Sequence, residues 1–347
     1  MDNYIIRKYV QGDLALLKND WQELEKGKEM SYFQTYDWYE SINDVVPSQG
    51  SVFFLTASKN DKVKLIAPLW ILRNNYLFIN KKGCYFWGRE GYSDYLNFIY
   101  DEFDAESLNA LFSFIKSDFG IKKYFLEFLN EGTSVVPFLE QRMQRVTKIS
   151  FDYAALHLPE NKEDYVRCLS KHVRQNLRTA HNRALKDNVL FESEIIQKVD
   201  EKTLKKCWDI RNARLPFKEQ RERANWSLKT KMHVYLDKKL RIKIPYRNVM
   251  EVDKNGNVLL IKSGDDVAAF FYYGYEPLKK KITVMTAGTN TQYARYSPGV
   301  YHMFLQIQRW IEDDSVKVVD FTRGNEKYKF DLGCKQMPVS NLSFLFP

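Results

Sequence analysis

The 347 residues are enough for two domains of ordinary size, and 44% hydrophobic with 28% charged residues exclude a disordered chain. The formal net charge of +9 favours an acidic or phosphorylated partner without identifying it. The longest apolar run, residues 65–72, is far shorter than the roughly 20 residues of a membrane helix. The first residues also lack the basic and apolar regions of a signal peptide, so we expect a soluble, cytoplasmic protein.

The first half of the chain mixes short helices and strands. An aromatic-rich run, residues 32–39, opens the second predicted helix, and a polar turn over residues 59–61 joins two apolar strands. The hydrophobic periodicity predicts helices over 19–26, 35–44 and 105–117 and strands over 51–58, 62–72, 123–129 and 150–158.

The basic residues are concentrated in one segment. Residues 161–247 hold 23 Lys and Arg against 11 Asp and Glu, a net charge of +12, so the rest of the chain carries −3. Within this segment residues 170–186 are predicted to form a helix, with Val173, Leu177, Ala180 and Ala184 as its buried stripe. A second stripe beside it carries Arg174, Arg178 and His181, with Lys171 close by. Such a stripe is able to hold phosphates, although a solvated basic face explains it equally well.

The second half repeats the plan of the first. Strands are predicted over 258–261 and 267–275, joined by the tight turn 263–266, followed by a strand over 281–287, a helix over 300–313 and a strand over 316–321. Residues 52–55 align with residues 258–261, and each precedes a polar turn and a second apolar strand. Two hairpins placed alike indicate duplication of one α/β unit. We therefore expect one unit over residues 1–149 and a second over residues 150–347, closely packed.

Ser297-Pro298-Gly299 marks the start of the last long helix. Ser is a good N-cap, and Pro is preferred at the first helical position. The exposed amides of the first turn, which include those of Gly299 and Val300, together with the helix dipole, would make an anion site, and Arg295 would add a charged clamp. An ordinary capped helix is the alternative.

A carboxylate and a Tyr-Lys pair follow this helix. Asp320 comes at the end of the strand over 316–321, and Gly324 then precedes Tyr328 and Lys329. This order is typical of a ligand-facing edge in an α/β sheet. The alternative for Asp320 is a structural carboxylate that accepts from turn amides or pairs with a nearby cation.

These motifs resemble a known family. Arg295-Tyr296-Ser297-Pro298-Gly299, the helix after it and Asp320-Phe321-x-x-Gly324-x-x-x-Tyr328-Lys329 are similar to the C-terminal signature of CelD-like acyltransferases of the GNAT superfamily, which are related to FemAB-type aminoacyltransferases. Lys171-x-x-Arg174-x-x-x-Arg178 and Phe33-Gln34-Thr35-x-x-Trp38 also match. The resemblance covers most of the chain and implies an α/β (α+β) fold of two tandem GNAT-like units, each a mixed, mostly antiparallel sheet flanked by helices.

The resemblance also implies a reaction. An acyl group passes from acetyl-CoA or another acyl-CoA co-substrate to an amine, with no metal. The general Gln/Arg-x-x-Gly-x-Gly/Ala loop that holds the pyrophosphate here reads Arg295-x-x-Pro298-Gly299, with fewer glycines. The donor-binding residues implied by the resemblance are Arg295, Ser297, Gly299, Val300, Thr286 and Ala287, the last two through backbone amides that stabilise the thioester oxygen.

The remaining roles follow from the same chemistry. The amine must lose a proton to a base, for which Asp320, His302 or a relayed water is expected, and Tyr328 would protonate the thiolate. Arg174, Arg178 and Lys329 are the candidates for substrate binding. A structural role is the alternative for His302. The four cysteines lie far apart without a CxxC pair, so we expect buried thiols rather than nucleophiles, disulfides or a zinc site.

Three functions therefore compete. The first is a cytosolic N-acyltransferase acting on the amino group of a sugar or a cell-envelope or polysaccharide precursor. The second is a FemAB-type aminoacyltransferase, in which an aminoacyl-tRNA is the donor and the basic segment contacts RNA. The third is a GNAT scaffold that binds a partner or ligand without catalysis, because a fold does not by itself imply chemistry.

Overall fold

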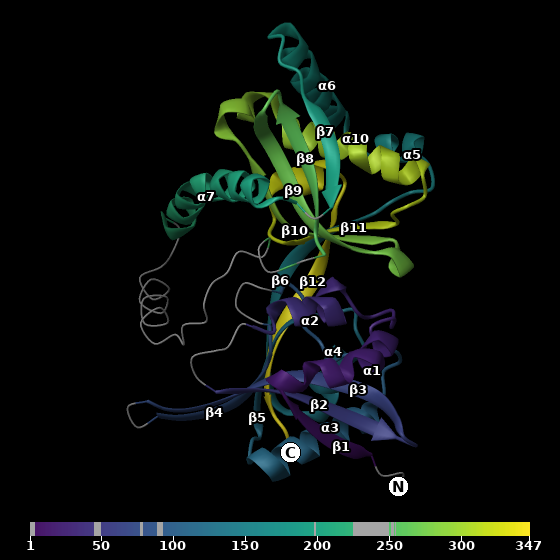
Figure 1. Ribbon diagram of the computed structural model, residues 1–347, viewed down its shortest axis with the longest axis vertical. Coiled ribbons are helices and arrows are strands. Elements are labelled where there is room, and N and C mark those ends of the chain that lie inside the picture. The colour runs from purple at the N-terminus through teal and green to yellow at the C-terminus, as the bar shows by residue number, and fades with distance from the viewer. Residues whose placement is uncertain are drawn as a thin grey trace. The chain divides into compact units, whose positions relative to one another are not determined.

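The computed structural model describes residues 4–44, 50–76, 79–88, 93–197, 199–224, 250, 253 and 255–347, which form two compact units (Figure 1). Unit 1 contains the described residues up to Tyr153 together with the C-terminal strand from Gln336. Unit 2 contains the described residues between Ala154 and Lys335. Each unit is a mixed, mostly antiparallel sheet flanked by helices, which confirms the predicted fold class.

Unit 1 has the sheet order β1-β2-β3-β4-β5-β12. Its neighbouring strands are antiparallel except β4 and β5, which are parallel because α3 connects them. The elements up to the first hairpin are β1 (Ile5–Val10), η1 (Gln11–Leu17), α1 (Lys18–Leu24), η2 (Tyr32–Gln34), α2 (Tyr36–Ile42), β2 (Ser51–Lys59) and β3 (Lys62–Tyr76). The others are β4 (Ile79–Phe86), α3 (Ala105–Phe119), β5 (Lys123–Asn130), α4 (Val135–Arg142), the first part of β6 (Gln144–His157) and β12 (Lys335–Leu345).

Aromatic side chains hold α1 and α2 against the sheet of unit 1. Trp21, Tyr39 and Phe54 are fully buried, and the ring of Trp21 lies 4.9 Å from that of Tyr39 and 5.7 Å from that of Phe54. Large rings in edge-on and tilted pairs bury much apolar surface and fix their relative orientation. The aromatic run predicted from the sequence is therefore part of the core of unit 1.

Unit 2 repeats part of this succession, since β8, β9, β10, α10 and β11 follow one another as β2, β3, β4, α3 and β5 do. The end of β6 lies beside β11, where Leu158 N donates to Lys317 O, and the order continues β11-β10-β9-β8-β7. The elements are α5 (Lys162–Cys168), α6 (Lys171–Lys186), β7 (Glu192–Gln197), α7 (Glu201–Ala224), β8 (Asn257–Ser263) and β9 (Asp266–Glu276), then η3 (Pro277–Lys279), β10 (Lys281–Thr289), η4 (Thr291–Tyr296), α10 (Pro298–Glu312), β11 (Val318–Arg323) and α11 (Lys327–Asp331).

The sheet of unit 2 has two apolar faces. Ile282 and Val284 of β10 pack in one cluster with Met303 and Ile307 of α10, and α5 and α6 cover this same face. Phe270 of β9 belongs to the second cluster, which α7 covers on the opposite side of the sheet. Figure 1 shows α7 on one side of strands β8 to β10 and α6 with α10 on the other. Because side chains alternate along a strand, β8 and β9 each contribute to both clusters.

The two hairpins confirm the predicted repeat and correct its alignment. Each has a register shift just before its turn, between Ala57 and Ser58 in β2 and between Ile261 and Lys262 in β8. Alignment on these bulges pairs residues 54–57 with residues 258–261, two residues further along than the sequence comparison placed them. A slip of two residues leaves every side chain on the same face, so the apolar pattern alone does not detect it.

The strand after each connecting helix is also alike in the two units. β4, α3 and β5 form a parallel crossover in unit 1, as β10, α10 and β11 do in unit 2. Phe128 in β5 and Thr322 in β11 both have positive φ, 58° and 52°, which L residues rarely adopt. Shared irregular backbone at matching positions is stronger support for duplication than the hairpins are.

The C-terminal strand does not stay with the residues that precede it. β12 pairs antiparallel with β5, from Val339 opposite Asn130 to Leu345 opposite Lys123, so it belongs to unit 1 although the sequence analysis assigned it to the second unit. Strand pairing depends on partners far away in sequence, which local patterns do not reveal. The division of the chain between residues 149 and 150 stays a prediction. Among the described residues, no helix has the length and apolar character needed to cross a membrane.

Candidate functional site

Strands β10 and β11 separate partway along their length. Their parallel pairing covers Lys281 with Val318, Ile282 with Val319 and Thr283 with Asp320, and in the described structure it extends no further. A bulge between Val284 and Thr286 then bends β10. The predicted donor-binding residues Thr286 and Ala287 lie beyond the last pair, where β9 remains the ladder partner of β10. In the described structure the other edge of β10 has no ladder partner at this point, although Thr286 is buried and Thr322 Oγ1 of β11 still donates to Val284 O at 3.0 Å.

The start of α10 differs from the predicted cap. Ser297 is the N-cap residue and Pro298 the first helical residue, but Ser297 has φ 48° and its side chain makes no capping hydrogen bond, so the expected side-chain cap is wrong. Tyr301 N donates to Ser297 O at 3.1 Å. The amides of Gly299 and Val300 come earlier in the helix and have no intrahelical acceptor. Ser297 is exposed and Val300 is half-buried, whereas Pro298 and Gly299 are buried, so the helix start reaches solvent at Ser297.

Gly299 places the helix start at the end of β10. A Cβ atom at Gly299 would lie 3.3 Å from both Ala269 Cβ and Thr289 Oγ1, a tighter contact than most Cβ atoms make. The missing side chain therefore lets α10 approach the end of β10, with the hydrogen atoms of Gly299 directed at the sheet. The absence of a side chain at Gly299 thus permits the close packing of α10 on the sheet, and its predicted role in donor binding stays a prediction.

Two guanidinium groups lie beside the helix start. The Arg295 side chain is 61% exposed, forms an ion pair of 2.9 Å with Asp187 and lies over the ring of Tyr296 at 5.1 Å. Arg183 of α6 donates from Nη1 to Arg295 O at 2.5 Å. Arg183 and Arg295 thus give the start of α10 a positive environment that Asp187 partly offsets.

Asp320 is buried in the middle of β11, not at its end. Its Oδ1 accepts from Thr322 N at 2.8 Å, and its Oδ2 lies 3.1 Å from Lys281 Nζ. Burial alone would lower the pKa of Lys281, but Asp320 and Glu276 outweigh burial and raise it. Only 1% of Asp320 is exposed, which favours the structural role that the sequence analysis held as its alternative.

Tyr328 and Lys329 lie on the short helix α11. Lys329 is 3% exposed, and its Nζ donates to the carbonyl oxygens of Arg323 at 2.6 Å and Gly324 at 3.2 Å. It also forms an ion pair of 3.0 Å with Glu326. This charge stabilises the loop after β11, which leaves the predicted contact with substrate without support from the geometry. The half-buried ring of Tyr328 packs against Phe271 and Phe321.

His302 lies on α10, in the wall of a cavity between α6 and α10. It is 7% exposed, and its pKa falls from 6.5 to about 4 because of burial first and then the charges of Arg309 and His181. The imidazole is therefore neutral at neutral pH. Among the described residues, the cavity lining includes none from β10 or β11. His302 is thus separate from the edge where those strands part.

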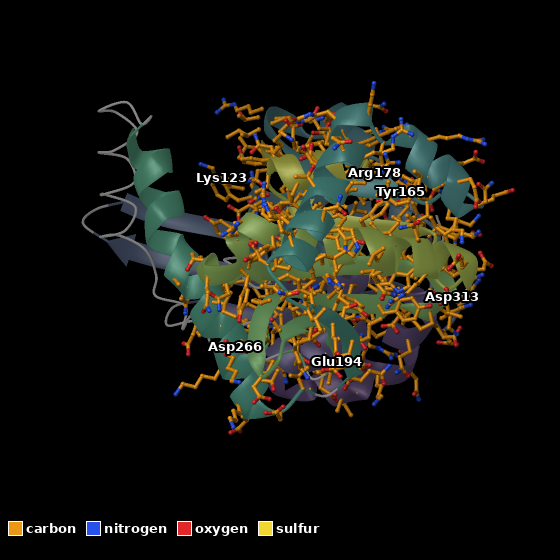
Figure 2. The ribbon with its side chains drawn as sticks, turned by 90° about the horizontal axis from the view of Figure 1, so that it is seen from above. Lys123, Tyr165, Arg178, Glu194, Asp266 and Asp313 are labelled. Carbon is orange, nitrogen blue, oxygen red and sulfur yellow. The ribbon has the colours of Figure 1, made fainter. Side chains whose placement is uncertain are left out.

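Helix α6 has the predicted buried stripe. Val173, Leu177, Ala180 and Ala184 are all buried. Arg174 is half-buried, and Arg178 is exposed and can be followed in Figure 2. Neither arginine forms an ion pair with another described residue, so both are available to an anion. The remainder of the predicted basic segment, over residues 225–249, lies outside the described residues.

The thiols and acidic residues offer no other reactive centre. Cys84, Cys207 and Cys334 are buried as expected, and burial raises the pKa of each, to about 12 for Cys207 and Cys334. Cys168 is exposed, which the sequence did not indicate. Within the described ranges, no group of three His, Cys, Asp or Glu side chains is arranged to hold a metal ion.

Comparison with known families finds a match in the second half of the chain. Residues 245–330 match the family described as acetyltransferase (GNAT) domain. This match covers the segment that contains β8 to β11 with α10. No curated protein is similar enough in sequence to count as a relative.

Solved structures of similar fold extend over nearly the whole chain. FemX superposes with a TM-score of 0.56 at 11% identity, covering 96% of both chains. The C-terminal DUF2156 domain of an Agrobacterium fabrum protein assigned as a lysylphosphatidylglycerol synthetase has a TM-score of 0.56 at 9% identity and covers 95% of this chain and 92% of its own. L-PGS from Bacillus licheniformis has a TM-score of 0.51 at 9% identity, with 92% of each chain covered.

These likenesses, at such low identity, concern the fold. Together with the domain match they support an acyltransferase, while its donor and acceptor stay open. The chain therefore has the GNAT-superfamily fold of the FemAB-related type, in two tandem units, as its C-terminal motifs indicated.

Proposed function

We propose that the protein is an N-acyltransferase that uses an acyl-CoA, with acetyl-CoA as the first candidate. Its acceptor is the amino group of a sugar or of another cell-envelope or polysaccharide precursor. The reaction takes place in unit 2, where β10 and β11 part. One observation carries the proposal: α10 begins without a side-chain cap beside the end of β10, at the point where β11 has left it.

The start of α10 has the chemistry that a diphosphate requires. The amides of Gly299 and Val300 lack intrahelical acceptors, and the helix dipole favours negative charge at this end. Arg295 and Arg183 add two cations. A pyrophosphate at a helix N-terminus with flanking arginines is a strong, charge-assisted arrangement.

Positioning supplies much of the rate in such a transfer. A bound acyl-CoA supplies the acyl group as a thioester, and an amine held in line attacks it directly. We assign the backbone amides near Thr286 and Ala287 to the developing negative charge on the thioester oxygen. Tyr328 is the proposed donor of a proton to the leaving thiolate, since its half-buried ring packs on Phe321 of β11.

The roles of the two predicted bases differ. Asp320 is held by Lys281 and by the amide of Thr322, so we assign it a positioning role at the last β10–β11 pair before the strands part. His302 faces the separate cavity and is not part of the proposed transfer site. A relayed water, which the sequence analysis also considered, is then the proposed route for the proton of the amine.

Calorimetry with acetyl-CoA, longer acyl-CoAs and free coenzyme A tests this function. Ser297→Asp places a carboxylate where the diphosphate would lie, and the matched control Ser297→Asn has the same shape without the charge. We expect Ser297→Asp to weaken binding by about 100-fold, and Ser297→Asn to bind like the wild type. A carboxylate at a helix N-terminus stabilises the fold by about 0.3–1 kcal/mol, so loss of binding would not reflect unfolding.

The outcomes separate the hypotheses. Equal affinity of the two variants would place the diphosphate elsewhere. A wild-type protein that binds no coenzyme A derivative would favour the non-catalytic scaffold. Ser297 is a sharper target than Gly299, because any side chain at Gly299 meets Ala269 and Thr289 at 3.3 Å and disturbs the packing of α10.

An aminoacyl-tRNA donor is the second candidate. The observation that favours it is the pair Arg174 and Arg178 on α6, neither of which has an ion-pair partner in the described structure. Binding of RNA phosphates should weaken steeply as salt rises, and Arg174→Gln with Arg178→Gln should reduce that slope. A shallow salt dependence, the same in the double variant, would remove this candidate.

A further inference from the structure

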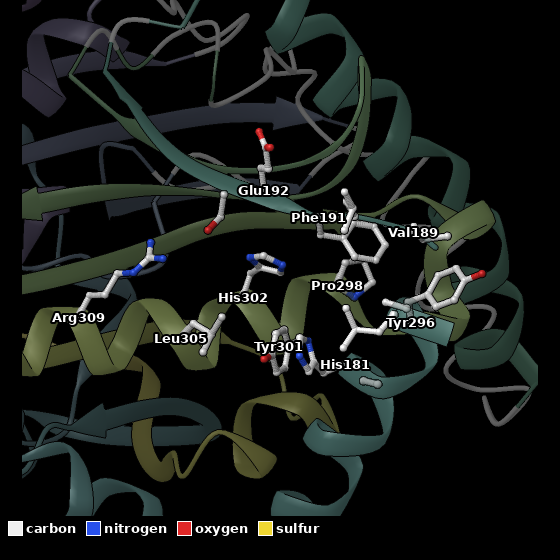
Figure 3. A pocket seen from close by; sticks show the side chains of 15 residues that line it. His181, Val189, Phe191, Glu192, Tyr296, Pro298, Tyr301, His302, Leu305 and Arg309 are labelled. Carbon is white, nitrogen blue, oxygen red and sulfur yellow. The ribbon is translucent and has the colours of Figure 1, made fainter. Parts of the chain in front are cut away.

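A cavity of about 540 Å³ lies in unit 2 between α6, α10 and the start of β7 (Figure 3). Its size is typical of sites for small molecules. Most of its lining is apolar, and this part comprises Ala180, Ala184, Leu185, Val189, Leu190, Phe191, Pro298 and Leu305. The described lining includes no residue of β10 or β11, while Tyr296 and Pro298 place one end of the cavity beside the start of α10, where the diphosphate is proposed to bind.

His302 brings unused hydrogen-bonding capacity to this cavity. Only 7% of His302 is exposed, and its Nδ1 has no hydrogen-bond partner among the described residues. A buried polar atom without a partner is costly to a fold and calls for an explanation. Figure 3 shows the imidazole rising from α10 toward the segment that carries Glu192. A ligand in the cavity would provide the partner that the protein does not.

The polar groups are not spread evenly along the cavity. Pro298, His302, Leu305 and Arg309 are spaced along one face of α10, and the 11 helical steps from Pro298 to Arg309 rise about 16 Å. The guanidinium of Arg309 and the imidazole of His302 lie on the same side of the helix, whereas the Glu192 carboxylate points away from it (Figure 3). The site is therefore long and apolar, with the guanidinium of Arg309 near the end opposite Pro298.

We propose that this cavity binds an unbranched aliphatic carboxylate, that is, a free fatty acid. The carboxylate lies between Arg309 and His302, and the chain extends toward Phe191, Leu185 and Val189. The aliphatic chain matches the apolar lining, and one negative charge matches one guanidinium. The proposal does not depend on acyl transfer, because Arg309 and His302, which hold the carboxylate, have no part in the proposed transfer site.

The probe is decanoate, measured by calorimetry on the full chain. We expect saturable binding of one molecule. Decanol, which lacks the charge, should bind about tenfold more weakly, and acetate, which lacks the chain, should not bind at these concentrations. Absence of saturable decanoate binding overturns the proposal, and so does equal affinity for decanoate and decanol.

Matched variants locate the site. Ala184→Leu fills the cavity from α6, and Thr179→Leu adds the same side chain at an exposed position of the same helix. Arg309→Gln removes the cation, and Arg167→Gln removes an exposed arginine of α5 whose partner is Asp164. We expect Ala184→Leu to abolish binding and Arg309→Gln to weaken it about tenfold, with both controls unchanged.

His302→Phe retains an aromatic ring but removes the hydrogen-bonding nitrogens. It should therefore weaken the binding of decanoate more than the binding of decanol. Binding that is unchanged in Ala184→Leu and in Arg309→Gln would show that decanoate associates elsewhere. A melting temperature for each variant excludes loss of binding through unfolding. Because acyl-CoA binding is measured separately, failure here leaves the proposed transfer function intact, and failure there leaves the cavity proposal intact.

Discussion

The connecting helices of the two units begin in opposite ways. In unit 1 the N-cap of α3 is Asp104, whose side chain accepts from the amides of Glu106 and Ser107. In unit 2 the N-cap of α10 is Ser297, whose side chain accepts from none, so the corresponding amides of Gly299 and Val300 are left without a side-chain partner. The start of α3 is therefore occupied by a carboxylate of the protein itself, whereas the start of α10 is available to an anion from solution.

This difference separates a structural copy from a candidate active copy. After duplication, unit 1 keeps the crossover of β4, α3 and β5, and its helix start is occupied by an internal carboxylate. The corresponding start in unit 2 lies beside Arg183 and Arg295 and is exposed at Ser297. Ligand specificity can thus change at a single cap while strand order and packing stay the same.

The places where the parallel strands pair, β4 with β5 and β10 with β11, also differ in charge. Cys84 and Tyr124 pair where β4 meets β5. Both are uncharged and fully buried. At the junction of β10 and β11, Asp320 pairs with Lys281 inside the unit. A buried ion pair contributes little net stability, but removal of one partner leaves the charge of the other poorly compensated.

The largest expected effect is therefore at the charged junction. Asp320→Ala should lower the free energy of unfolding by about 3 kcal/mol, because the half-buried Lys281 loses its partner at 3.1 Å while Glu276 remains. Cys84→Ala, at the junction of unit 1, removes no charge and should cost about 1 kcal/mol. Urea unfolding of both variants measures the difference. Equal effects would contradict the view that the ion pair distinguishes the two junctions.

A pH change should also act on unit 2 selectively. The pKa of His302 is about 4 in the fold, against 6.5 for the exposed side chain, so between these values only the unfolded state takes up the proton. The contribution of neutral His302 to the free energy of unfolding is fully present above pH 6.5 and is lost as the pH falls toward 4. At pH 5 the loss should be about 2 kcal/mol.

Unit 1 serves as the internal control for this effect. Its sequence contains no histidine, since all five lie between residues 157 and 302. Hydrogen exchange at pH 5 should therefore accelerate in β8 to β10 more than in β2 and β3, and His302→Gln should reduce the difference. Uniform acceleration in both units would show that histidine titration is not the cause.

The smallest expected effect is at the capped helix of unit 1. Asp104→Ala removes the acceptor for two amides and should cost about 1 kcal/mol of stability, whereas Asp104→Asn retains an oxygen acceptor and should cost less. Neither variant should change the affinity for acyl-CoA, which calorimetry measures. A loss of that affinity in Asp104→Ala would place donor binding in unit 1 and reverse the comparison.

Hydrophobic spacing located most helices and strands, because an element with one buried face repeats its apolar residues at the period of that element. The predicted helix over 170–186 matches α6 (Lys171–Lys186), and the strand over 51–58 matches β2 (Ser51–Lys59). Elements with little burial were not predicted: β7 has no fully buried residue, and α11 is a helix of 5 residues. Their patterns are too weak or too short to be recognised.

The candidate site was predicted in outline and not in detail. The sequence of Ser297, Pro298 and Gly299 placed a helix start correctly, but the left-handed backbone of Ser297 and the contact of Gly299 with Thr289 depend on how α10 meets β10. The partner of Asp320 is Lys281, 39 positions earlier in the chain, and no local pattern indicates that pairing. The cavity beside His302 likewise needs α6 and α10 together, and nothing in the sequence pointed to it.

The sequence by itself determined the duplicated plan, the apolar faces and the motifs that resemble GNAT acyltransferases, because periodicity, turn residues and short motifs are local properties of the chain. Only the tertiary structure decided which polar groups meet: that Asp320 pairs with Lys281, that β12 joins β5, and that the start of α10 has no side-chain cap. The physical reason is that buried charges and backbone amides are satisfied by whatever the fold brings near them, often from distant parts of the chain.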